Sequence, residues 1–315
     1  MSYFLVKQPG LLTLIQDQGR YGAHNLGLTN GGPLDPLAFD WANRLLGNDI
    51  NDTCLEVSFG GLTLESQVDS SIAITGAELS CKINGKVIEQ WRSHVIHKND
   101  LLEFGYVTAG VRAYLAVSGG FQIAPSFGSS ATVVREKVGG LNGDKLQAGD
   151  ELPCAATSTT GVLSVAEADR PQYGIQNGTQ AVLRVVLGYQ HQAFELLEQL
   201  KFFSFDYKVT DRSDRMGFRL EGEPVHTDMV GMLSEGICHG AIQIPADGQP
   251  IVLMNDRQTI GGYPKIGSMI PIDTARLAQL KPGSSIKFEE ISLEDAHNIH
   301  TLHQSRYRNS SPLNH

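Results

Sequence analysis

The sequence lacks the marks of several large classes of protein. Its four cysteines are widely spaced and form no CxxC pair, which excludes the usual zinc motifs and a small disulfide framework. No segment approaches the ~18 consecutive apolar residues of a membrane-spanning helix, and the N-terminal segment has neither a continuous apolar core nor an A-x-A cleavage site. We therefore expect a cytoplasmic protein with reduced thiols and no membrane partner.

A net positive charge and two familiar sequence motifs are also missing. The 25 Lys and Arg residues against 34 Asp and Glu give a formal net charge of -9, which repels nucleic-acid phosphates, so we expect no nucleic-acid partner. The chain has no GxxxxGK[ST] loop for nucleotide phosphates. It also has no GxSxG nucleophile elbow, because Met232 stands where the first glycine before Ser234 would be.

What the chain does contain is typical of a β-rich protein with two domains. Its 315 residues suggest two domains at about 100–200 residues each, and its 34 glycines, many in doublets, indicate tight turns between short strands. A loop and linker zone of low periodicity covers residues 118–168. Short runs of β-type composition predict strands near Phe4 and at 11–15, 55–59, 62–66, 71–75, 100–104, 111–117, 183–188, 202–209, 237–244, 251–255 and 285–291.

A few helices interrupt these strands. The first is predicted to begin after Asp35, with Pro36 at its first position and Gly47 as its stop. Others are expected at 191–200, after a cap at Asp273, and after a cap at Ser292 with Asp295 three residues on. The tail from residue 305 has no core pattern, so we expect it to be frayed.

Four polar, glycine-containing loop segments are candidates for a binding site, because a rigid β scaffold usually presents binding groups on loops. In one of them Asp214 places an acceptor beside the donor fork of Arg215, which suits an amide or a carboxylate. Gln243 adds a carboxamide at a strand end. The remaining candidates are Asp17 and Arg20 in the first segment and Asp256, Gln258, Tyr263 and Lys265 in the last.

Each candidate has a structural alternative. Asp17 with Arg20, and Asp214 with Arg215, can be explained as turn salt bridges or caps. For any one of these residues taken singly, the structural role is favoured. All four segments are polar and are flanked by apolar strands, which makes one common cleft plausible. The residues by themselves therefore indicate a β-rich protein that binds a small polar or anionic ligand.

Two histidine-containing patterns are assigned structural roles. Cys238 and His239 are neighbours on a predicted strand, where adjacent side chains point to opposite faces and cannot form a nucleophile–base pair. A second pattern repeats histidine every three residues in the C-terminal helix, and such a stripe drifts around the helix with no fixed carboxylate beside it. We predict no metal site. The stripe consists of His297, His300 and His303.

Long ordered motifs in the same segments resemble a known family. They include TLIQDQGRYG (13–22), GGPLDPLAFDWANRLLGN (31–48), DRSDRMGFRLEG (211–222) and GAIQIPADGQPIVLMNDRQTIGGYPKIG (240–267). The pattern is similar to the family called allophanate hydrolase subunit 2, which is also described as biotin-dependent carboxyltransferase-like and includes the C subunits of 5-oxoprolinases. The resemblance runs through nearly the whole chain.

This resemblance implies a fold and a domain division. The fold would be mainly β with a few helices, in two subdomains related to the cyclophilin-like β-barrel. The N-terminal β-rich subdomain would cover residues 1–170, the C-terminal barrel 171–292, and a C-terminal helix and tail 293–315. Strands can cross between the subdomains.

The resemblance also implies a function and partners. The first expectation is the C subunit of an ATP-dependent 5-oxoprolinase, which opens 5-oxoproline to L-glutamate together with a B-like partner of the allophanate hydrolase subunit 1 type and an A-like partner. The alternatives are a carboxyltransferase subunit that acts on urea or a related amide with carboxybiotin, and a non-catalytic partner of a kinase-inhibitor-like protein. Because the chain has neither an ATP-binding loop nor a biotin attachment segment, it would be inactive alone, and the ATP site is unassigned.

Within this pattern the residues acquire expected roles. Asp214, Arg215 and Lys265 are the catalytic candidates, with Asp214 accepting an N–H and the cations donating to oxygens whose charge grows during activation. The substrate-binding candidates are Asp17, Arg20, Gln243, Asp256, Gln258 and Tyr263. One segment departs from the family pattern GSRST, because Gly128-Ser129-Ser130-Ala131-Thr132 lacks the arginine. A different cation, a different ligand or a lost surface salt bridge would each account for this departure.

Overall fold

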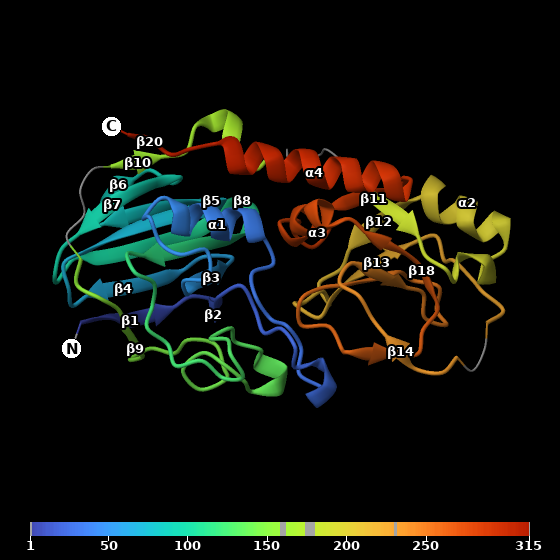
Figure 1. The fold of residues 1–315 in the computed structure, drawn as a ribbon, viewed down its shortest axis with the longest axis horizontal. Coiled ribbons are helices and arrows are strands. Elements are labelled where there is room, and N and C mark those ends of the chain that lie inside the picture. Colours follow the sequence, from blue (N-terminus) through green and yellow to red (C-terminus); the bar gives the residue numbers. More distant parts are fainter. Residues whose placement is uncertain (1, 158–161, 174–179, 230–231, 315) are drawn as a thin grey trace. The chain divides into compact units, whose positions relative to one another are not determined.

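The computed structural model describes residues 2–157, 162–173, 180–229 and 232–314. The chain divides into two compact units, which are described separately. The first unit contains residues 1–23, 30–172 and 309–315, and the second contains 24–29 and 173–308. Strands dominate both, with four α-helices in the described part of the chain, so the expected mainly β fold is confirmed (Figure 1).

An 11-stranded sheet forms the first unit. Its main path runs β20-β10-β7-β5-β8-β4-β1-β9, while β3 pairs with β2 and β8, and β6 pairs with β5. Apolar side chains such as Phe4, Leu64, Ile74 and Leu115 are fully buried in its core. The strands are β1 Tyr3–Pro9, β2 Leu12–Gln16, β3 Cys54–Ser58, β4 Leu62–Ser66, β5 Ser70–Ile83, β6 Lys86–Ile88, β7 Arg92–Ile96, β8 Leu101–Val117, β9 Glu151–Pro153, β10 Leu163–Ser164 and β20 Leu313–Asn314.

The long pair β5 and β8 corrects one prediction. The sequence predicts separate strands at 100–104 and 111–117, but β8 is continuous through Gly105 and Gly110. Gly110 has a φ of 78°, which in a sequence is typical of a turn. Here the antiparallel pairing with β5 shifts register three times between Gly76 and Cys81, so bulges accommodate the irregular residues inside one strand.

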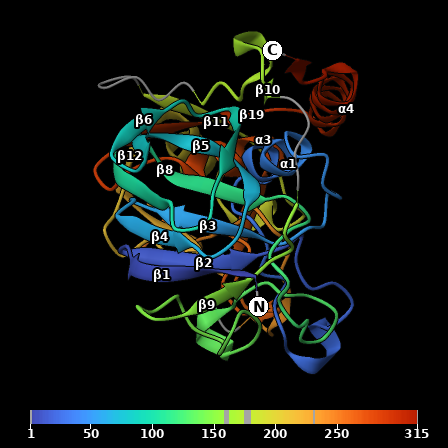
Figure 2. The ribbon, with the colours of Figure 1, turned by 90° about the vertical axis from the view of Figure 1, so that its left-hand side faces the viewer.

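The first helix, α1 (Pro36–Arg44), forms as the sequence predicts. The Asp35 side chain accepts a hydrogen bond from the Ala38 N–H at 3.1 Å, and Pro36 occupies the first turn, where no N–H is required. Phe39 and Trp41 are buried, and the helix packs on β5 and β8 (Figures 1 and 2).

A closed barrel forms the second unit, in the order β11-β18-β15-β16-β13-β12-β19. It closes through parallel pairing of β11 with β19. Phe202 stacks on Phe288 inside, with ring centroids 4.4 Å apart. The strands are β11 Ala181–Leu187, β12 Asp206–Val209, β13 Gly217–Gly222, β15 Ala241–Gln243, β16 Ile251–Leu253, β18 Lys265–Met269 and β19 Ser285–Glu290, and a separate two-stranded sheet joins β14 Glu235–Gly236 to β17 Ile260–Gly261.

The helices of the second unit correct two predictions. The strand expected at 202–209 begins only at Asp206, because Phe202–Ser204 completes α2. Asp273 is not the cap of α3, which begins directly at Pro271; its buried carboxylate instead binds Arg184 at 2.8 Å and Arg276 at 3.1 Å. The α-helices here are α2 Leu196–Ser204, α3 Pro271–Ala278 and α4 Leu293–Asn309, and the 3₁₀ turns of the chain are η1 His24–Leu26, η2 Val134–Glu136, η3 Glu167–Asp169 and η4 His191–Ala193.

The C-terminal segment is more ordered than expected. The predicted Ser292 cap is confirmed, since its hydroxyl accepts from the Asp295 N–H at 3.0 Å. The expectation of a frayed tail from residue 305 is wrong, because α4 continues to Asn309 and β20 then pairs with β10. In the described residues no helix is long and apolar enough to cross a membrane. The division into subdomains at 1–170 and 171–292, with a helix and tail at 293–315, stays a prediction.

Asp40 predicts a pH dependence of stability in the first unit. Burial raises the pKa of this carboxyl to about 7, although the Gln18 amide opposes the rise. Because the folded protein then holds a proton that the unfolded chain has lost, stability falls as pH rises from about 4 to about 7. We expect Asp40→Asn to remove this fall. In thermal unfolding, the midpoint temperature of the variant relative to the wild type should therefore be higher at pH 8 than at pH 4.

Glu151→Gln is the matched control, because Glu151 is an exposed carboxylate in the same unit. Its midpoint should follow the wild type at both pH values. Parallel pH curves for Asp40→Asn and the wild type would contradict the raised pKa.

Candidate functional site

In the first unit, Asp17 holds a loop in place. Its carboxylate accepts hydrogen bonds from the Gly19 N–H at 2.9 Å, the Ser129 hydroxyl at 2.5 Å and the Ser130 N–H at 2.6 Å. The side chain is buried. The bond to Gly19, two residues on, is an Asx turn, so the structural alternative considered for Asp17 describes its contacts well.

Arg20 belongs to the same loop connection. Its guanidinium is fully buried and donates to the carbonyl oxygens of Ser126 at 3.0 Å and Ala131 at 3.1 Å. A guanidinium that donates to carbonyls fixes the backbone of that segment. Ser130, at the position of the missing arginine, donates to Asp17 and bonds the Thr53 hydroxyl at 2.7 Å. The departure from the family pattern therefore lies in the loop that Asp17 and Arg20 hold.

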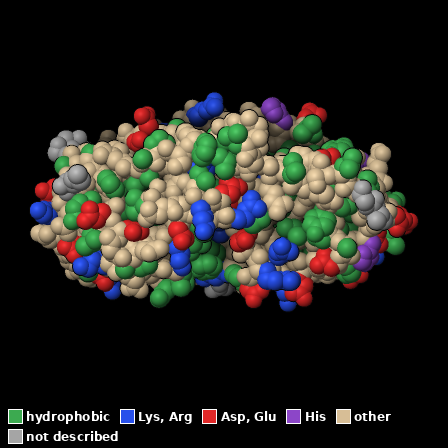
Figure 3. Space-filling model, turned by 90° about the horizontal axis from the view of Figure 1, so that it is seen from below, with side chains coloured by type: hydrophobic (Ala, Val, Ile, Leu, Met, Phe, Trp, Pro, Cys, Tyr) green, Lys and Arg blue, Asp and Glu red, His purple; other side chains and the backbone are tan. Residues whose placement is uncertain are grey.

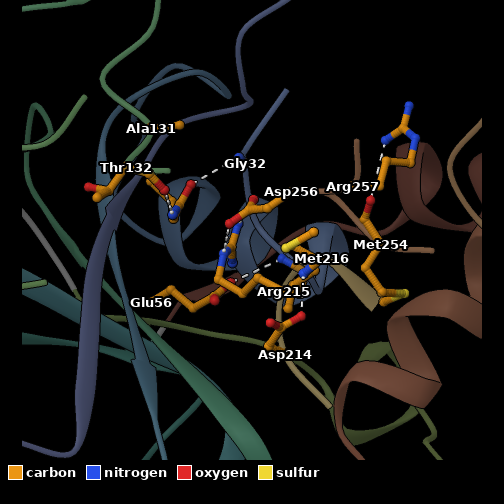
Figure 4. Close-up of polar contacts among 12 residues, drawn as sticks. Gly32, Glu56, Ala131, Thr132, Asp214, Arg215, Met216, Met254, Asp256 and Arg257 are labelled. Atoms are coloured by element: carbon orange, nitrogen blue, oxygen red, sulfur yellow. Dashed lines mark hydrogen bonds and ion pairs between the residues drawn. The ribbon is translucent and has the colours of Figure 1, made fainter. Parts of the chain in front are cut away.

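A buried polar network under the glycine-rich 31–35 loop was missed by the sequence analysis. Fully buried Glu56 accepts from the Leu34 N–H at 3.0 Å and from the Tyr114 hydroxyl at 2.8 Å. The Gln16 amide oxygen accepts from the Gly32 N–H at 2.9 Å (Figure 4). Burial, followed by the charge of Glu56, raises the pKa of Tyr114 well above its usual value. In the sequence, only the charge of Glu56 between the apolar Leu55 and Val57 could have indicated this network.

In the second unit, Arg215 and Asp256 form a buried ion pair. The guanidinium donates through Nε at 3.0 Å and through Nη2 at 3.1 Å to the two oxygens of the carboxylate, and Figure 4 shows the two side chains pointing toward each other. The Asp256 N–H also donates to the Arg215 carbonyl at 2.9 Å. Such a two-pronged pair fixes both groups in one geometry, so the structure brings these two predicted residues together.

Asp214 lies beside this pair but has a different environment. It is exposed, and its carboxylate accepts from the Met216 N–H at 2.8 Å and the Gly217 N–H at 3.2 Å. These bonds start strand β13 after the turn (Figure 4). The carboxylate is thus held rigidly while it stays accessible to solvent.

Lys265 and Gln243 lie directly opposite each other on β18 and β15. A β-bulge between Ile242 and Gln243 sets this register, and opposite residues of a strand pair present their side chains on the same face. Both are largely buried, with 8% and 5% of their surface exposed. The Lys265 ammonium pairs with Glu235, a residue that was not among the candidates.

Gln258 and Tyr263 are the most accessible of the predicted residues. Both side chains are exposed, Tyr263 by 50%, and neither makes a hydrogen bond to another described residue. They lie in the segment between β16 and β18. Their accessibility suits contact with a ligand or partner.

The two histidine patterns are distinct from these candidates. Cys238 and His239 lie in a turn and not on a strand; Cys238 is exposed and 3.3 Å from the Ser268 hydroxyl. Burial, followed by the nearby Arg257 charge, lowers the pKa of His239 to about 4, which keeps its ring neutral. The His297, His300 and His303 stripe lies on α4. Among the residues that the structure describes, no group of three His, Cys, Asp or Glu could hold a metal ion.

The predicted residues of the second unit include both acceptors and donors of hydrogen bonds. Asp214 can accept an N–H, while Lys265 and Gln243 can donate to oxygen. Charges of both signs are interspersed on the face drawn in Figure 3, which agrees with the small-ligand expectation better than with a polyanion. Seven predicted residues belong to this unit, and Asp17 and Arg20 belong to the other.

Comparison with known families and proteins gives clear similarities. Residues 26–290 match the family described as "Carboxyltransferase domain, subdomain A and B". The chain is 36% identical over 287 residues to the C subunit of 5-oxoprolinase from Haemophilus influenzae, covering 90% of this chain and 89% of that protein. It is also 36% identical over 293 residues to the Escherichia coli protein of the same name, covering 91% of each.

Larger proteins contain a similar region. The "Urea amidolyase" of Saccharomyces cerevisiae is 30% identical over 309 residues, which are 92% of this chain but 17% of that protein. The crystal structure of Kluyveromyces lactis urea amidolyase matches 98% of this chain and 20% of its own, with a TM-score of 0.90 and 26% identity. The structure of TTHA0988 matches 92% of this chain and 56% of its own, with a TM-score of 0.81 and 32% identity.

The Arg215–Asp256 pair predicts strong coupling in stability. Asp256→Ala alone removes the carboxylate that both prongs of this buried guanidinium bind, so we expect a loss of about 3–5 kcal/mol. Adding Arg215→Met should restore part of this loss, because the charge that Asp256 neutralises is then removed as well. Chemical unfolding of the two single variants and the double variant measures the coupling; losses that simply add would show that the two residues are independent.

Proposed function

We propose that this chain, which belongs to the family of carboxyltransferase domains with subdomains A and B, is the C subunit of a 5-oxoprolinase. The observation that carries the proposal is the match to two bacterial proteins of that name over about nine-tenths of both chains. The match to the Saccharomyces cerevisiae urea amidolyase, by contrast, covers only 17% of that protein. A similarity that spans both proteins almost end to end favours the same role over a role of one part of a larger enzyme.

The proposed reaction is the opening of a lactam at the expense of ATP. Water adds to the carbonyl carbon of 5-oxoproline, the ring C–N bond breaks, the carbonyl becomes the second carboxylate of L-glutamate, and the ring nitrogen leaves as the amine. ATP is hydrolysed to ADP and phosphate by the complex. The chain would act in the cytoplasm with A-like and B-like partners, of which the latter is of the allophanate hydrolase subunit 1 type, and would be inactive alone.

The residues of the second unit suit the polar groups of this substrate. Asp214, exposed and fixed by its turn, would accept the lactam N–H. Lys265 and Gln243 would donate to the lactam oxygen, whose negative charge grows as the carbonyl carbon is attacked. Asp256 would orient Arg215 as a further donor, with Gln258 and Tyr263 at the solvent side.

Carboxyl transfer to urea or a related amide is the second candidate function. The fold similarity to Kluyveromyces lactis urea amidolyase, with a TM-score of 0.90, favours it. Urea also presents an N–H beside a carbonyl, so the same donors and acceptor would serve, and carboxybiotin would have to be delivered by another protein. A regulatory partner without catalysis is the third candidate, and it would tolerate changes to the site residues.

Activity of the reconstituted complex tests the proposal. We expect glutamate release from 5-oxoproline and ATP only when this chain and purified A-like and B-like partners are all present. Lys265→Ala should lower kcat about 100-fold, the scale of one donor to a developing oxyanion, and Asp214→Ala should raise KM, because it removes an acceptor that binds ground state and transition state alike.

Asp211→Ala is the control, since Asp211 is an exposed carboxylate of the same loop and lies outside the proposed site. Full activity in both Lys265→Ala and Asp214→Ala would remove these residues from the site. No glutamate from a fully assembled complex would overturn the 5-oxoprolinase proposal and direct the assay to biotin-dependent carboxylation.

A further inference from the structure

In the second unit, one carboxylate oxygen of Glu235 accepts three hydrogen bonds. Oε1 accepts hydrogen bonds from the Lys265 ammonium, from the Tyr189 hydroxyl and, at 2.7 Å, from the Gln190 amide. Lys265, followed by Tyr189, lowers the pKa of this carboxyl. A carboxylate held on three sides has little freedom to move, so the Lys265 ammonium that it binds is held as well.

Gln190 ties this carboxylate to the strand that carries the lysine. Its amide oxygen accepts from the backbone N–H of Lys265 at 2.8 Å, while its amide nitrogen donates to Glu235. The side chain is 8% exposed. A single buried carboxamide therefore sets both the backbone position of Lys265 and the position of the partner of its side chain.

Beside this cluster lies a buried donor that has no hydrogen-bond partner among the residues that the structure describes. The Gln243 Nε2 is shielded from solvent and makes no hydrogen bond to any described residue, although burying an unpaired amide costs about 1–3 kcal/mol. Gln243 is opposite Lys265 on the neighbouring strand. Its amide also lies against Gly261, where a Cβ would be only 2.7 Å from Nε2, and Gly261 is itself paired with Glu235.

We propose that Glu235 is a positioning residue that holds the Lys265 ammonium beside the unpaired Gln243 amide, so that the two donors together receive one carbonyl oxygen of the ligand. The identity of that oxygen, the lactam carbonyl of 5-oxoproline, rests on the proposed function. The arrangement itself, an unpaired buried donor next to a fixed cation, is independent of it.

The charge balance favours a neutral carbonyl over a carboxylate. Lys265 already has a carboxylate partner, so the resting pair carries no net charge, and an anionic ligand would bring a second negative charge next to Glu235. A carbonyl oxygen adds none in the ground state. Negative charge appears only as the carbonyl reacts, and two prearranged donors are most effective at that stage.

The kinetic test compares Glu235→Gln with the wild type in the reconstituted complex. Glutamine keeps the shape but binds the ammonium weakly, so we expect kcat to fall about 10–100-fold, the scale of a misplaced reacting group, with little change in KM. Tyr189→Phe, which removes one of the three donors, should have a smaller effect of the same kind. Glu221→Gln is the matched control, because Glu221 is an exposed carboxylate of the same barrel.

A binding measurement on the isolated full chain tests the inference without any turnover. We would follow the side-chain amide resonance of Gln243 by NMR, assigned by its loss in Gln243→Met, while adding either 2-pyrrolidinone, which has the lactam but no carboxylate, or L-proline, which has the carboxylate but no lactam carbonyl. The amide should shift with 2-pyrrolidinone only, and Glu235→Gln should need several-fold more of it for the same shift.

The outcomes separate the two proposals. If the wild-type complex releases no glutamate but 2-pyrrolidinone still shifts the Gln243 amide, the 5-oxoprolinase function fails and the carbonyl site stands. A shift with L-proline alone, no shift with either probe, or a response in Glu235→Gln equal to that of Glu221→Gln would overturn the role given to Glu235.

Discussion

Closure of the seven-stranded barrel is the constraint on which the candidate chemistry of the second unit depends. Because β11 pairs with both β18 and β19, the ladder returns on itself and its strands cannot slide without breaking several pairings at once. The side-chain period of two then decides which residues face each other. Gln243 and Lys265 meet only because a bulge between Ile242 and Gln243 shifts the register.

Local chemistry made part of this structure predictable. The Asp35 cap, Pro36 and the apolar face of α1 act within a few residues of one another, and the helix forms as its sequence indicates. Asp17 and Arg20 were recognised as polar loop residues with two possible roles, and their contacts at residues 126–131, more than a hundred positions away, could not be known from spacing. The ion pair of Arg215 with Asp256 spans 41 positions and was equally inaccessible to local spacing.

The contacts of two acidic residues, Asp273 and Glu235, could not be predicted from the sequence. Asp273 is a residue type that often caps helices, and it lies near the start of α3. The N-cap is nevertheless Ile270, and the Asp273 carboxylate pairs with Arg184 and Arg276. Glu235 carries no local signal, because β14 is only two residues long and the residues that bind its carboxylate are Tyr189, Gln190 and Lys265. A cluster assembled from three distant segments leaves no pattern in any one of them.

The pairing of β20 with β10 has a consequence for how such a module can be joined to others. The strands nearest the two ends of the chain, β1 and β20, belong to the same 11-stranded sheet, while the barrel unit is made from the interior of the chain together with residues 24–29. One cut between residues 172 and 173 would leave each fragment carrying a piece of the other unit. A domain fused before β1 or after β20 is therefore attached to the sheet unit, and no single truncation of this stretch of chain separates one unit whole from the other.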